Sequence, residues 1–315
     1  MRPEVLEGDV REVLKTLDDE SVQCGVTSPP YWGLRDYGVD DQLGLEPTPE
    51  EFVENMVGVF QEVKRVLRKD GTVWLNLGDS YSSHKDCKSP PQTISNNNQH
   101  EIEKGKSVTR DTKKLKEAGL KNKDLVGIPW RVAFALQADG WYLRSDIIWN
   151  KPNPMPESVT DRPTKSHEYI FLLTKSPKYY YDHEAIKEKG SGRIPGNKVP
   201  QKGAGMVGFE IRDGLLEAQQ KPQDSRNKRS VWKITTKPYK EAHFATFPEE
   251  LPETCIKAGT QKGDVVLDIF AGSGTTLRVA SKLGRKGIGI ELNPEYIKIL
   301  KKRCKIESMS LEAFV

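Results

Sequence analysis

The sequence predicts an α/β protein built on a largely parallel sheet, because short apolar runs alternate with segments of helical periodicity. Six apolar runs bounded by turn residues are expected to be buried strands, at residues 22–28, 72–78, 144–150, 168–175, 264–270 and 286–292. Three intervening helices, each ending at a glycine, are expected over 49–71, 128–140 and 275–284. Ligands of such folds bind at the carboxyl ends of the strands, so the residues that follow the strands are the candidates for function.

Composition limits the class of protein. The chain has 315 residues, of which 36% are hydrophobic and 30% charged, which suits one globular core with polar excursions. It has no apolar run long enough to cross a membrane, and its N-terminus has no signal-peptide pattern. Its four cysteines form no CxxC pair, so neither a disulfide framework nor a metal site is expected. A reducing cytoplasm is the expected location.

Two segments depart from the alternation of strands and helices. Residues 82–124 contain no aromatic residue and are rich in Ser, Asn, Gln and Lys, so a mobile polar excursion is expected there. Residues 184–240 carry 13 lysines and arginines against 6 aspartates and glutamates, which is +7 in a chain of net charge +4. This basic segment is expected to face nucleic-acid phosphates, although a solvated loop could have the same composition.

A glycine-rich turn follows the apolar run at 264–270. Its glycines, Gly272 and Gly274, allow a tight turn and a close approach of the backbone to a ligand, which the amides of the next helix would face. Leu277 replaces the third glycine of the dinucleotide pattern GxGxxG, and no Gly-Lys-Ser/Thr follows. Glu291 ends the next strand, where it can accept hydrogen bonds from ribose hydroxyls. The pattern favours a nucleoside without a phosphate chain over NAD or ATP, and an ordinary strand–helix turn is the alternative.

The segment TSPPYW, residues 27–32, follows the first apolar run. Its two prolines make it stiff and extended, so that its carbonyl groups can point outward. The exocyclic amine of a base is a poor nucleophile because its lone pair is delocalised into the ring. Ser28 Oγ and the Pro29 carbonyl could accept its two N–H bonds and so direct the lone pair towards an incoming methyl group. Tyr31 offers a stacking face for a base turned out of a duplex, and a purely structural Pro-Pro turn is the alternative.

These motifs resemble the beta group of DNA amino-methyltransferases, in which circular permutation places the catalytic half before the cofactor half. The resemblance covers nearly the whole chain, through Gly8-Asp9, SPPYW, NLGDSY, IIWNKPNPMP, SHEYIFLLTKSPKYYYD, HFATFPEEL and FAGSGTT in the family's order. It implies a Rossmann-like S-adenosylmethionine-dependent methyltransferase fold, with a mostly parallel seven-stranded sheet that has one antiparallel strand. Residues 1–183 and 241–315 would form the catalytic domain, and 184–240 an inserted target-recognition region.

The resemblance also implies the residues of the site. The catalytic residues would be Ser28, Pro29, Pro30 and Tyr31. The residues expected at S-adenosylmethionine are Asp9, Phe247, Pro248, Asp268, Phe270, Gly272, Ser273, Gly274, Thr275 and Glu291. The residues expected at DNA are Trp32, Lys151, Asn153, Arg226, Lys228 and Arg229. Trp32 could instead wall the pocket, and Lys151 and Asn153 could instead serve loop structure.

The expected activity is methylation of cytosine N4 in double-stranded DNA by direct transfer from S-adenosylmethionine. Adenine N6 is the alternative, since both bases place an amine beside a ring-nitrogen acceptor; in the family, serine at the first motif position goes mostly with cytosine and aspartate mostly with adenine. Cytosine C5 methylation needs a cysteine nucleophile, usually after proline, and no Pro-Cys pair occurs. A non-catalytic nucleic-acid-binding protein and a nicotinamide oxidoreductase are more distant alternatives. Besides duplex DNA, candidate partners are a second copy of the chain and a cognate restriction endonuclease that acts separately.

Overall fold

The computed structural model describes residues 2–34, 38–39, 42–82, 112–190, 225–236 and 247–306. The chain divides into two compact units, one of Met1–Tyr181 with Ser230–Val315 and the other of Asp182–Arg229. Most of the polar segment 82–124 and of the basic segment 184–240 lies outside the described residues.

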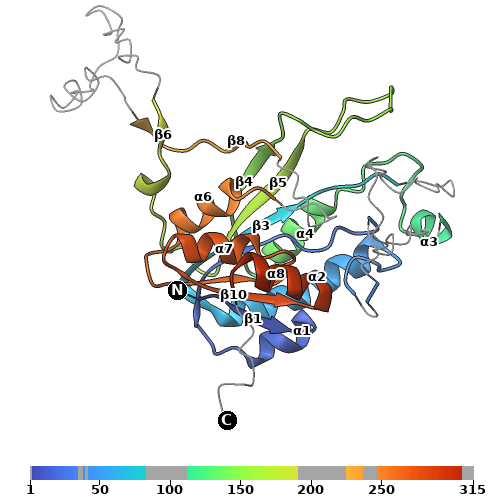
Figure 1. Ribbon diagram of the computed structural model, residues 1–315. Coiled ribbons are helices and arrows are strands. Elements are labelled where there is room, and N and C mark those ends of the chain that lie inside the picture. The colour runs from blue at the N-terminus through green and yellow to red at the C-terminus, as the bar shows by residue number, and fades with distance from the viewer. Residues whose placement is uncertain are drawn as a thin grey trace, which may run out of the picture. The chain divides into compact units, whose positions relative to one another are not determined.

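The larger unit is built on an eight-stranded sheet with the order β1-β10-β9-β2-β3-β5-β4-β8 (Figure 1). Its strands are β1 (Glu4–Glu7), β2 (Val22–Thr27), β3 (Leu67–Leu77), β4 (Tyr142–Asn150), β5 (His167–Thr174), β8 (Val231–Lys233), β9 (Val265–Asp268) and β10 (Lys286–Glu291). β5 is antiparallel to both of its neighbours, and the other neighbouring pairs are parallel. The single antiparallel strand is as expected. The described sheet has one strand more than the expected seven, because the short β8 pairs with β4 at the edge.

The strand order shows the circular permutation. β9 and β10 come from the C-terminal part of the chain, yet they lie between β1 and β2 from the N-terminal part. Cys24 pairs with Val266 and Gly25 with Leu267, so β2 and β9 run side by side in the same direction. The TSPPYW segment after β2 and the glycine-rich turn after β9 therefore leave the same edge of the sheet, where α/β proteins bind their ligands.

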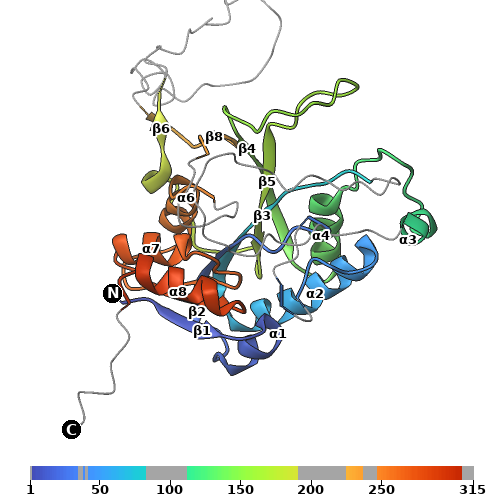
Figure 2. The ribbon, with the colours of Figure 1, turned by 45° about the vertical axis from the view of Figure 1, so that its right-hand side comes forward.

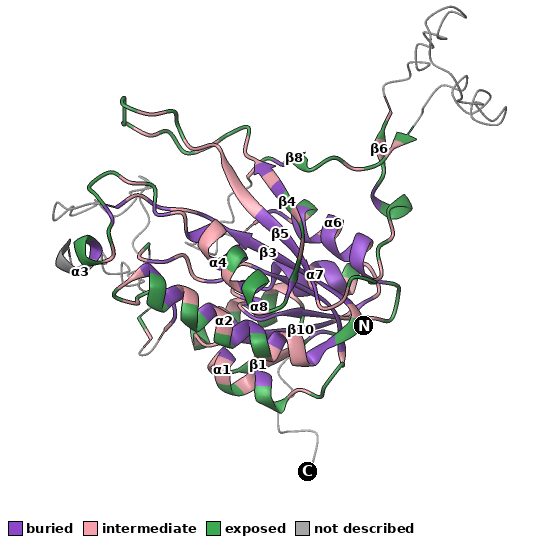
Figure 3. Ribbon diagram, turned by 180° about the vertical axis from the view of Figure 1, so that it is seen from behind, coloured by how far each residue is buried: buried purple, intermediate pink, exposed green. Residues whose placement is uncertain are grey.

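Helices cover both faces of the sheet (Figure 2). One face carries α1 (Val10–Val13), α2 (Pro49–Val66) and α4 (Ile128–Ala138), and the other carries α6 (Glu250–Gly259), α7 (Thr275–Lys282) and α8 (Pro294–Arg303). The strands between these layers are largely buried (Figure 3). The shorter elements are η1 (Leu14–Thr16), α3 (Thr112–Glu117), η2 (Glu184–Ile186), β6 (Glu188–Lys189) and β7 (Ser225–Arg226). None of the helices in the described part of the chain is both long and apolar enough to cross a bilayer.

α2 forms where its periodicity predicts it but ends earlier. The sequence places its end at Gly71, whereas the helix ends at Val66. Leu67 already pairs with Val22 of β2, so β3 begins there instead of at residue 72. The end of α2 is therefore set by the pairing of Leu67 with β2, and not by Gly71 as expected.

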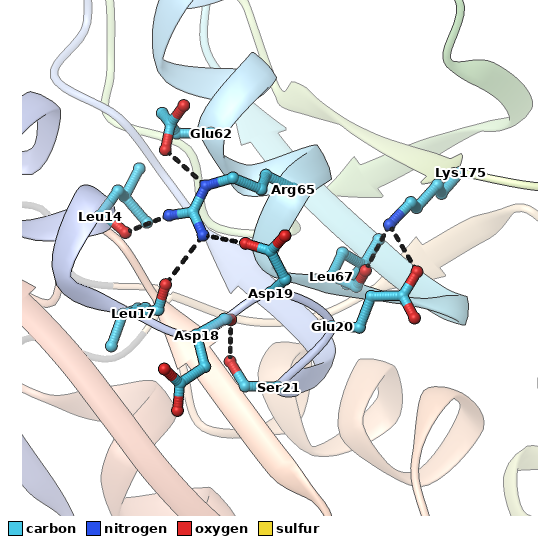
Figure 4. Close-up of polar contacts among 10 residues, drawn as sticks. All are labelled: Leu14, Leu17, Asp18, Asp19, Glu20, Ser21, Glu62, Arg65, Leu67 and Lys175. Carbon is cyan, nitrogen blue, oxygen red and sulfur yellow. Dashed lines mark hydrogen bonds and ion pairs between the residues drawn. The ribbon is translucent and has the colours of Figure 1, made fainter.

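Arg65, near the end of α2, fixes the edge of the sheet at which β2 begins. Its guanidinium donates to the carbonyl oxygens of Leu14 at 2.8 Å and Leu17 at 2.9 Å, and it pairs with Asp19 at 2.5 Å and Glu62 at 2.9 Å (Figure 4). These contacts join α2 to the segment that leads into β2. The start of β2 is therefore anchored, and its far end is the one that carries the candidate site.

Candidate active site

Asp268, the last residue of β9, joins the two permuted halves of the sheet. The residue is 2% exposed, and its carboxylate accepts hydrogen bonds from Thr27 Oγ1 at 2.8 Å and Thr276 Oγ1 at 2.7 Å. The Phe270 amide donates to it at 3.2 Å. Burial raises the pKa of Asp268 to about 6, against the opposing effect of these donors. Both carboxylate oxygens therefore already accept from donors within the protein. Asp268 thereby holds the end of β9 against Thr27, the residue before Ser28.

Glu291, at the end of β10, holds the glycine-rich turn. Its Oε2 accepts from the Gly272 amide at 2.7 Å and its Oε1 from the Asn293 amide at 2.9 Å. Burial raises the pKa of Glu291, and the backbone donors oppose that shift. Gly272 has φ of +49°, and a Cβ there would meet no protein atom closer than the Phe270 carbonyl oxygen at 4.0 Å. This side of the turn is therefore open to a ligand.

The other residues of the turn face α8. Gly274 has φ of +76°, and a Cβ there would lie 2.6 Å from Leu300 Cγ, so glycine is required for packing. The Ser273 and Thr275 hydroxyls accept from one guanidinium nitrogen of Arg303, at 2.7 and 2.9 Å. The side chains of Ser273 and Thr275 are thus engaged within the protein, and a cofactor contact by either residue stays a prediction.

Three further residues expected at the cofactor lie near the ends of neighbouring elements. Asp9 follows β1 and caps α1, accepting from the Arg11 amide at 2.7 Å; hydrogen bonds from the Arg11 guanidinium lower the pKa of Asp9. Phe247 is half-buried and Pro248 buried, just before α6. The Leu251 amide donates to the Pro248 carbonyl at 3.1 Å, in the turn with which α6 begins. The part of these residues in cofactor binding stays a prediction.

A polar cluster of Ser28, Tyr31, Asn76, Lys151 and Glu168 gathers at the ends of β2, β3, β4 and β5. Tyr31 OH donates to Glu168 Oε2 at 2.7 Å. Asn76 Nδ2 lies 2.9 Å from Tyr31 OH and 3.0 Å from the same carboxylate oxygen. Ser28 Oγ lies 3.5 Å from Tyr31 OH and 3.3 Å from Asn76 Nδ2. Lys151 pairs with the other Glu168 oxygen.

The side chain of Tyr31 is held at both its ring and its hydroxyl. A Cβ at Gly78 would lie 2.4 Å from Tyr31 Cε2, so a residue without a side chain is required where the ring meets the end of β3. Next to it, Pro29 is buried and Pro30 half-buried. The sequence suggested only a stacking face for Tyr31, and it did not reveal Asn76 or Glu168. The one available signal was position, because Asn76 lies near the end of one predicted strand and Glu168 at the start of another.

Lys165, in the connection between β4 and β5, has a buried Nζ with no hydrogen-bond partner among the described residues. Burial lowers the pKa of Lys165, and the carboxylates of Asp79 and Glu168 oppose the shift. Asp79 itself accepts from the amides of Gly127 at 3.0 Å and Ile128 at 3.1 Å, and thereby caps α4. A buried cation thus lies close to the polar cluster.

Trp32, the first of the residues expected at DNA, is buried. It is 2% exposed, and its Nε1 donates to the Glu46 carbonyl at 2.9 Å. The ring packs in the core cluster, and a contact of Trp32 with DNA stays a prediction. Asn153 exchanges two hydrogen bonds with the backbone of Thr236, at 3.0 and 3.1 Å, so its amide serves loop structure. Lys151 belongs to the polar cluster.

The smaller unit, Asp182–Arg229, contains the three basic residues expected at DNA. In its described part, the strands β6 and β7 are antiparallel. Glu188 pairs with Arg226 at 2.7 Å and with Arg229 at 2.5 Å, and the arginine side chains remain 37% and 65% exposed. One carboxylate therefore orients two exposed guanidinium groups, with Lys228 between them in the chain.

Comparisons with known proteins agree with this arrangement. Residues 22–302 match the N6/N4 family model described as DNA methylase. Type II methyltransferase M.Cfr9I of Citrobacter freundii is 49% identical over 314 residues, which cover 98% of this chain and 89% of the relative. Type II methyltransferase M.SmaI of Serratia marcescens is 46% identical over 299 residues, covering 95% and 89%.

The fold is similar to that of the PvuII DNA methyltransferase, described as cytosine-N4-specific. The TM-score is 0.65 at 19% identity, and the match covers 99% of this chain and 89% of the other. This likeness confirms the expected α/β methyltransferase fold, and the extent of the family match shows the family. The chain belongs to the N6/N4 family of DNA methylases and is a DNA methyltransferase.

Proposed function

We propose that the chain transfers a methyl group from S-adenosylmethionine to N4 of a cytosine turned out of duplex DNA. The observation that carries this proposal is the hydrogen bond between Thr27 and Asp268. It joins the end of β2, where Ser28 lies, to the end of β9, where the glycine-rich turn begins. Since adjacent strands lie about 4.8 Å apart, a methyl donor on the turn would be within reach of an amine at Ser28.

The glycine-rich turn fits an S-adenosyl ligand. The space beside Gly272 is open, and the carboxylate of Glu291 lies at the turn to accept from hydroxyl groups. Bound S-adenosylmethionine would supply an electrophilic methyl group. Ser28 Oγ and the Pro29 carbonyl would accept the two N–H bonds of the target amine and orient its lone pair. The amine becomes strongly acidic on methylation, so its proton can pass to water without a dedicated base.

Cytosine is favoured over adenine by two observations. The first position of the SPPY motif is Ser28 here, whereas in adenine enzymes it is mostly aspartate. The PvuII enzyme with the similar fold is described as cytosine-N4-specific. Adenine N6 is the second candidate because it presents the same type of amine beside a ring nitrogen.

We assign target recognition to the basic segment 184–240 and catalysis to residues 1–183 and 241–315. The support is the net charge of +7 in that segment and the exposed Arg226 and Arg229. The type II designation of the relatives supports a separately acting endonuclease as a partner. Assembly with a second copy of the chain stays a prediction.

Transfer of a tritiated methyl group to methylation-free genomic DNA tests the proposal, with digestion to nucleosides and chromatography of the product. N4-methylcytosine is expected; N6-methyladenine as the product would assign the second candidate instead. Ser28→Ala should slow single-turnover methylation and leave S-adenosylmethionine affinity unchanged. Ser21→Ala, in the turn at the other end of β2, is the matched control, since its hydroxyl donates to the Asp18 carbonyl at 2.7 Å, away from the polar cluster (Figure 4).

A further inference from the structure

We propose that Glu168 sets the direction of the hydrogen-bond chain through Tyr31 and thereby makes Ser28 an acceptor for the target amine. The inference rests on the proposed function, because it concerns the same amine-binding group. Glu168 would not touch the base; it would be a positioning residue that acts through Tyr31.

Three donors converge on the Glu168 carboxylate. Tyr31 OH and Asn76 Nδ2 approach Oε2 at 2.7 and 3.0 Å, and the Lys151 ammonium approaches Oε1. The Glu168 side chain is only 14% exposed, so water does not replace these partners freely. An ionised carboxylate can only accept hydrogen bonds. The hydroxyl hydrogen of Tyr31 is therefore committed to Glu168.

The lone pairs of the Tyr31 oxygen set the direction of the remaining hydrogen bonds. With its hydrogen turned to Glu168, the Tyr31 oxygen can only accept from its other neighbours. Those neighbours are Asn76 Nδ2 at 2.9 Å and Ser28 Oγ at 3.5 Å. The Ser28 hydroxyl hydrogen accordingly points towards Tyr31. Asn76 Nδ2 approaches one lone pair of Ser28 Oγ at 3.3 Å, and the second lone pair is left for an amine N–H.

This order of hydrogen bonds excludes a second orientation of the Ser28 hydroxyl. A serine hydroxyl can donate as well as accept, and a free hydroxyl turned towards the base would meet the amine hydrogens with its own hydrogen. Such a contact would repel the amine and would not direct its lone pair. When the hydrogen bonds run in one fixed direction, from Ser28 through Tyr31 to Glu168, the serine hydroxyl cannot turn its hydrogen towards the base. The site is thus preorganised before DNA binds, as catalytic sites are.

A double-mutant cycle on Glu168→Gln and Tyr31→Phe tests the proposal. Glutamine has one oxygen to offer three donors, and its NH2 group must face one of them, so the chain loses its fixed direction. Each single variant should lower the single-turnover methylation rate by roughly tenfold to a hundredfold, as for the loss of one hydrogen bond to a charged group. The double variant should stay within about twofold of the slower single variant, because Glu168 acts through the hydroxyl that Tyr31→Phe removes.

Two measurements separate positioning from general structural damage. The dissociation constants for S-adenosylmethionine and for DNA should stay unchanged in all three variants, so the loss appears in kcat. Glu157→Gln and Tyr179→Phe are the matched controls and should keep the wild-type rate. Glu157 pairs with Arg162 at 2.5 Å, and the Tyr179 hydroxyl accepts from Arg144 at 3.2 Å, both outside the polar cluster.

Multiplicative losses in the double variant, or a wild-type rate in Tyr31→Phe, would overturn the role of Glu168. The double-mutant cycle compares single-turnover rates of methyl transfer to the base that the wild-type protein methylates. N6-methyladenine as the product would therefore overturn the proposed cytosine specificity and leave the result of the cycle standing.

Discussion

Thr27 Oγ1 donates to Asp268 Oδ1 over 2.8 Å, although the two residues are 241 positions apart in the chain. Thr27 ends β2 and precedes Ser28, whereas Asp268 ends β9 and precedes the glycine-rich turn. A circularly permuted chain must bring its first and last parts together to assemble one site. This buried hydrogen bond is a direct link between those parts at the strand ends that carry the proposed chemistry.

Loss of that link is predicted to weaken both the fold and the activity. Thr27→Val keeps the shape of the side chain but removes a donor to a buried carboxylate, so the free energy of unfolding should fall by about 1–3 kcal/mol. Urea unfolding measures this change, and the methylation rate should fall with it. Thr16→Val is the control, since the exposed Thr16 hydroxyl donates to the Val13 carbonyl within its own turn. Equal stability of the two variants would contradict the role of Thr27.

The pKa of Asp268 predicts a pH dependence of stability. Burial raises this pKa from 3.8 to about 6, so the folded protein holds a proton that the unfolded chain has released between these values. The contribution of Asp268 is therefore fully present below pH 3.8 and is lost as the pH rises through about 6, by on the order of 3 kcal/mol.

Asp268→Asn removes this titration. Compared with the wild type, the variant should gain stability as the pH rises from about 4 to 7. Urea unfolding midpoints across this pH range measure the stability difference between the variant and the wild type. A difference that stays constant with pH would contradict the raised pKa of Asp268. In Asp161→Asn the trend should be absent, since Lys123 lowers the pKa of that exposed aspartate.

The two glycines of the turn are predicted to differ. Gly272→Ala should fold with a cost of about 1–2 kcal/mol from its left-handed backbone, yet weaken S-adenosylmethionine binding because the new methyl group enters the open side. Gly274→Ala should lose more stability, since its Cβ would lie 2.6 Å from Leu300. Calorimetric binding and thermal unfolding of both variants separate these effects. Unchanged cofactor affinity in Gly272→Ala would remove the turn from the proposed cofactor site.

The basic residues of the smaller unit are predicted to bind DNA phosphates. Alanine at Arg226, Lys228 and Arg229 together should lower the magnitude of the salt slope of DNA binding by about 0.9 for each phosphate contact removed. Glu188→Gln should have the opposite effect on affinity, because it removes the carboxylate that pairs with both arginines. Titrations at several salt concentrations measure both quantities. If the triple variant kept the wild-type slope and affinity, the contacts would lie elsewhere, with 82–124 the next candidate.

Lys165→Met is predicted to stabilise the free protein. The buried Nζ of Lys165 has no hydrogen-bond partner among the described residues, and methionine fills a similar length without a charge. At neutral pH the gain should be about 1–3 kcal/mol. Since burial lowers the pKa of Lys165, the folded protein releases this proton before the unfolded chain does, and wild-type stability rises with pH. The advantage of Lys165→Met should therefore shrink as the pH rises towards 10.5, and a destabilised variant at neutral pH would contradict the prediction.

Six strands of the sheet and three helices could be predicted from the sequence because each is a local pattern, whereas α6 and α8 were not predicted. The apolar runs became β2, β3, β4, β5, β9 and β10, and the periodic segments became α2, α4 and α7. The edge strands β1 and β8 were not predicted. Glu4–Glu7 reads EVLE and Val231–Lys233 has three residues, so neither forms an apolar run, and each is a strand only because a neighbour pairs with it.

The sequence by itself determined the segments that would meet at the site, because TSPPYW and FAGSGTT are continuous in the chain and their backbone chemistry is local. Only the tertiary structure decided which side chains face which partners. Glu168 reaches Tyr31 because antiparallel β5 begins beside the end of β3, and Asp268 reaches Thr27 because β9 pairs with β2. Contacts of this kind depend on the register between strands far apart in the chain, which no single stretch of sequence contains.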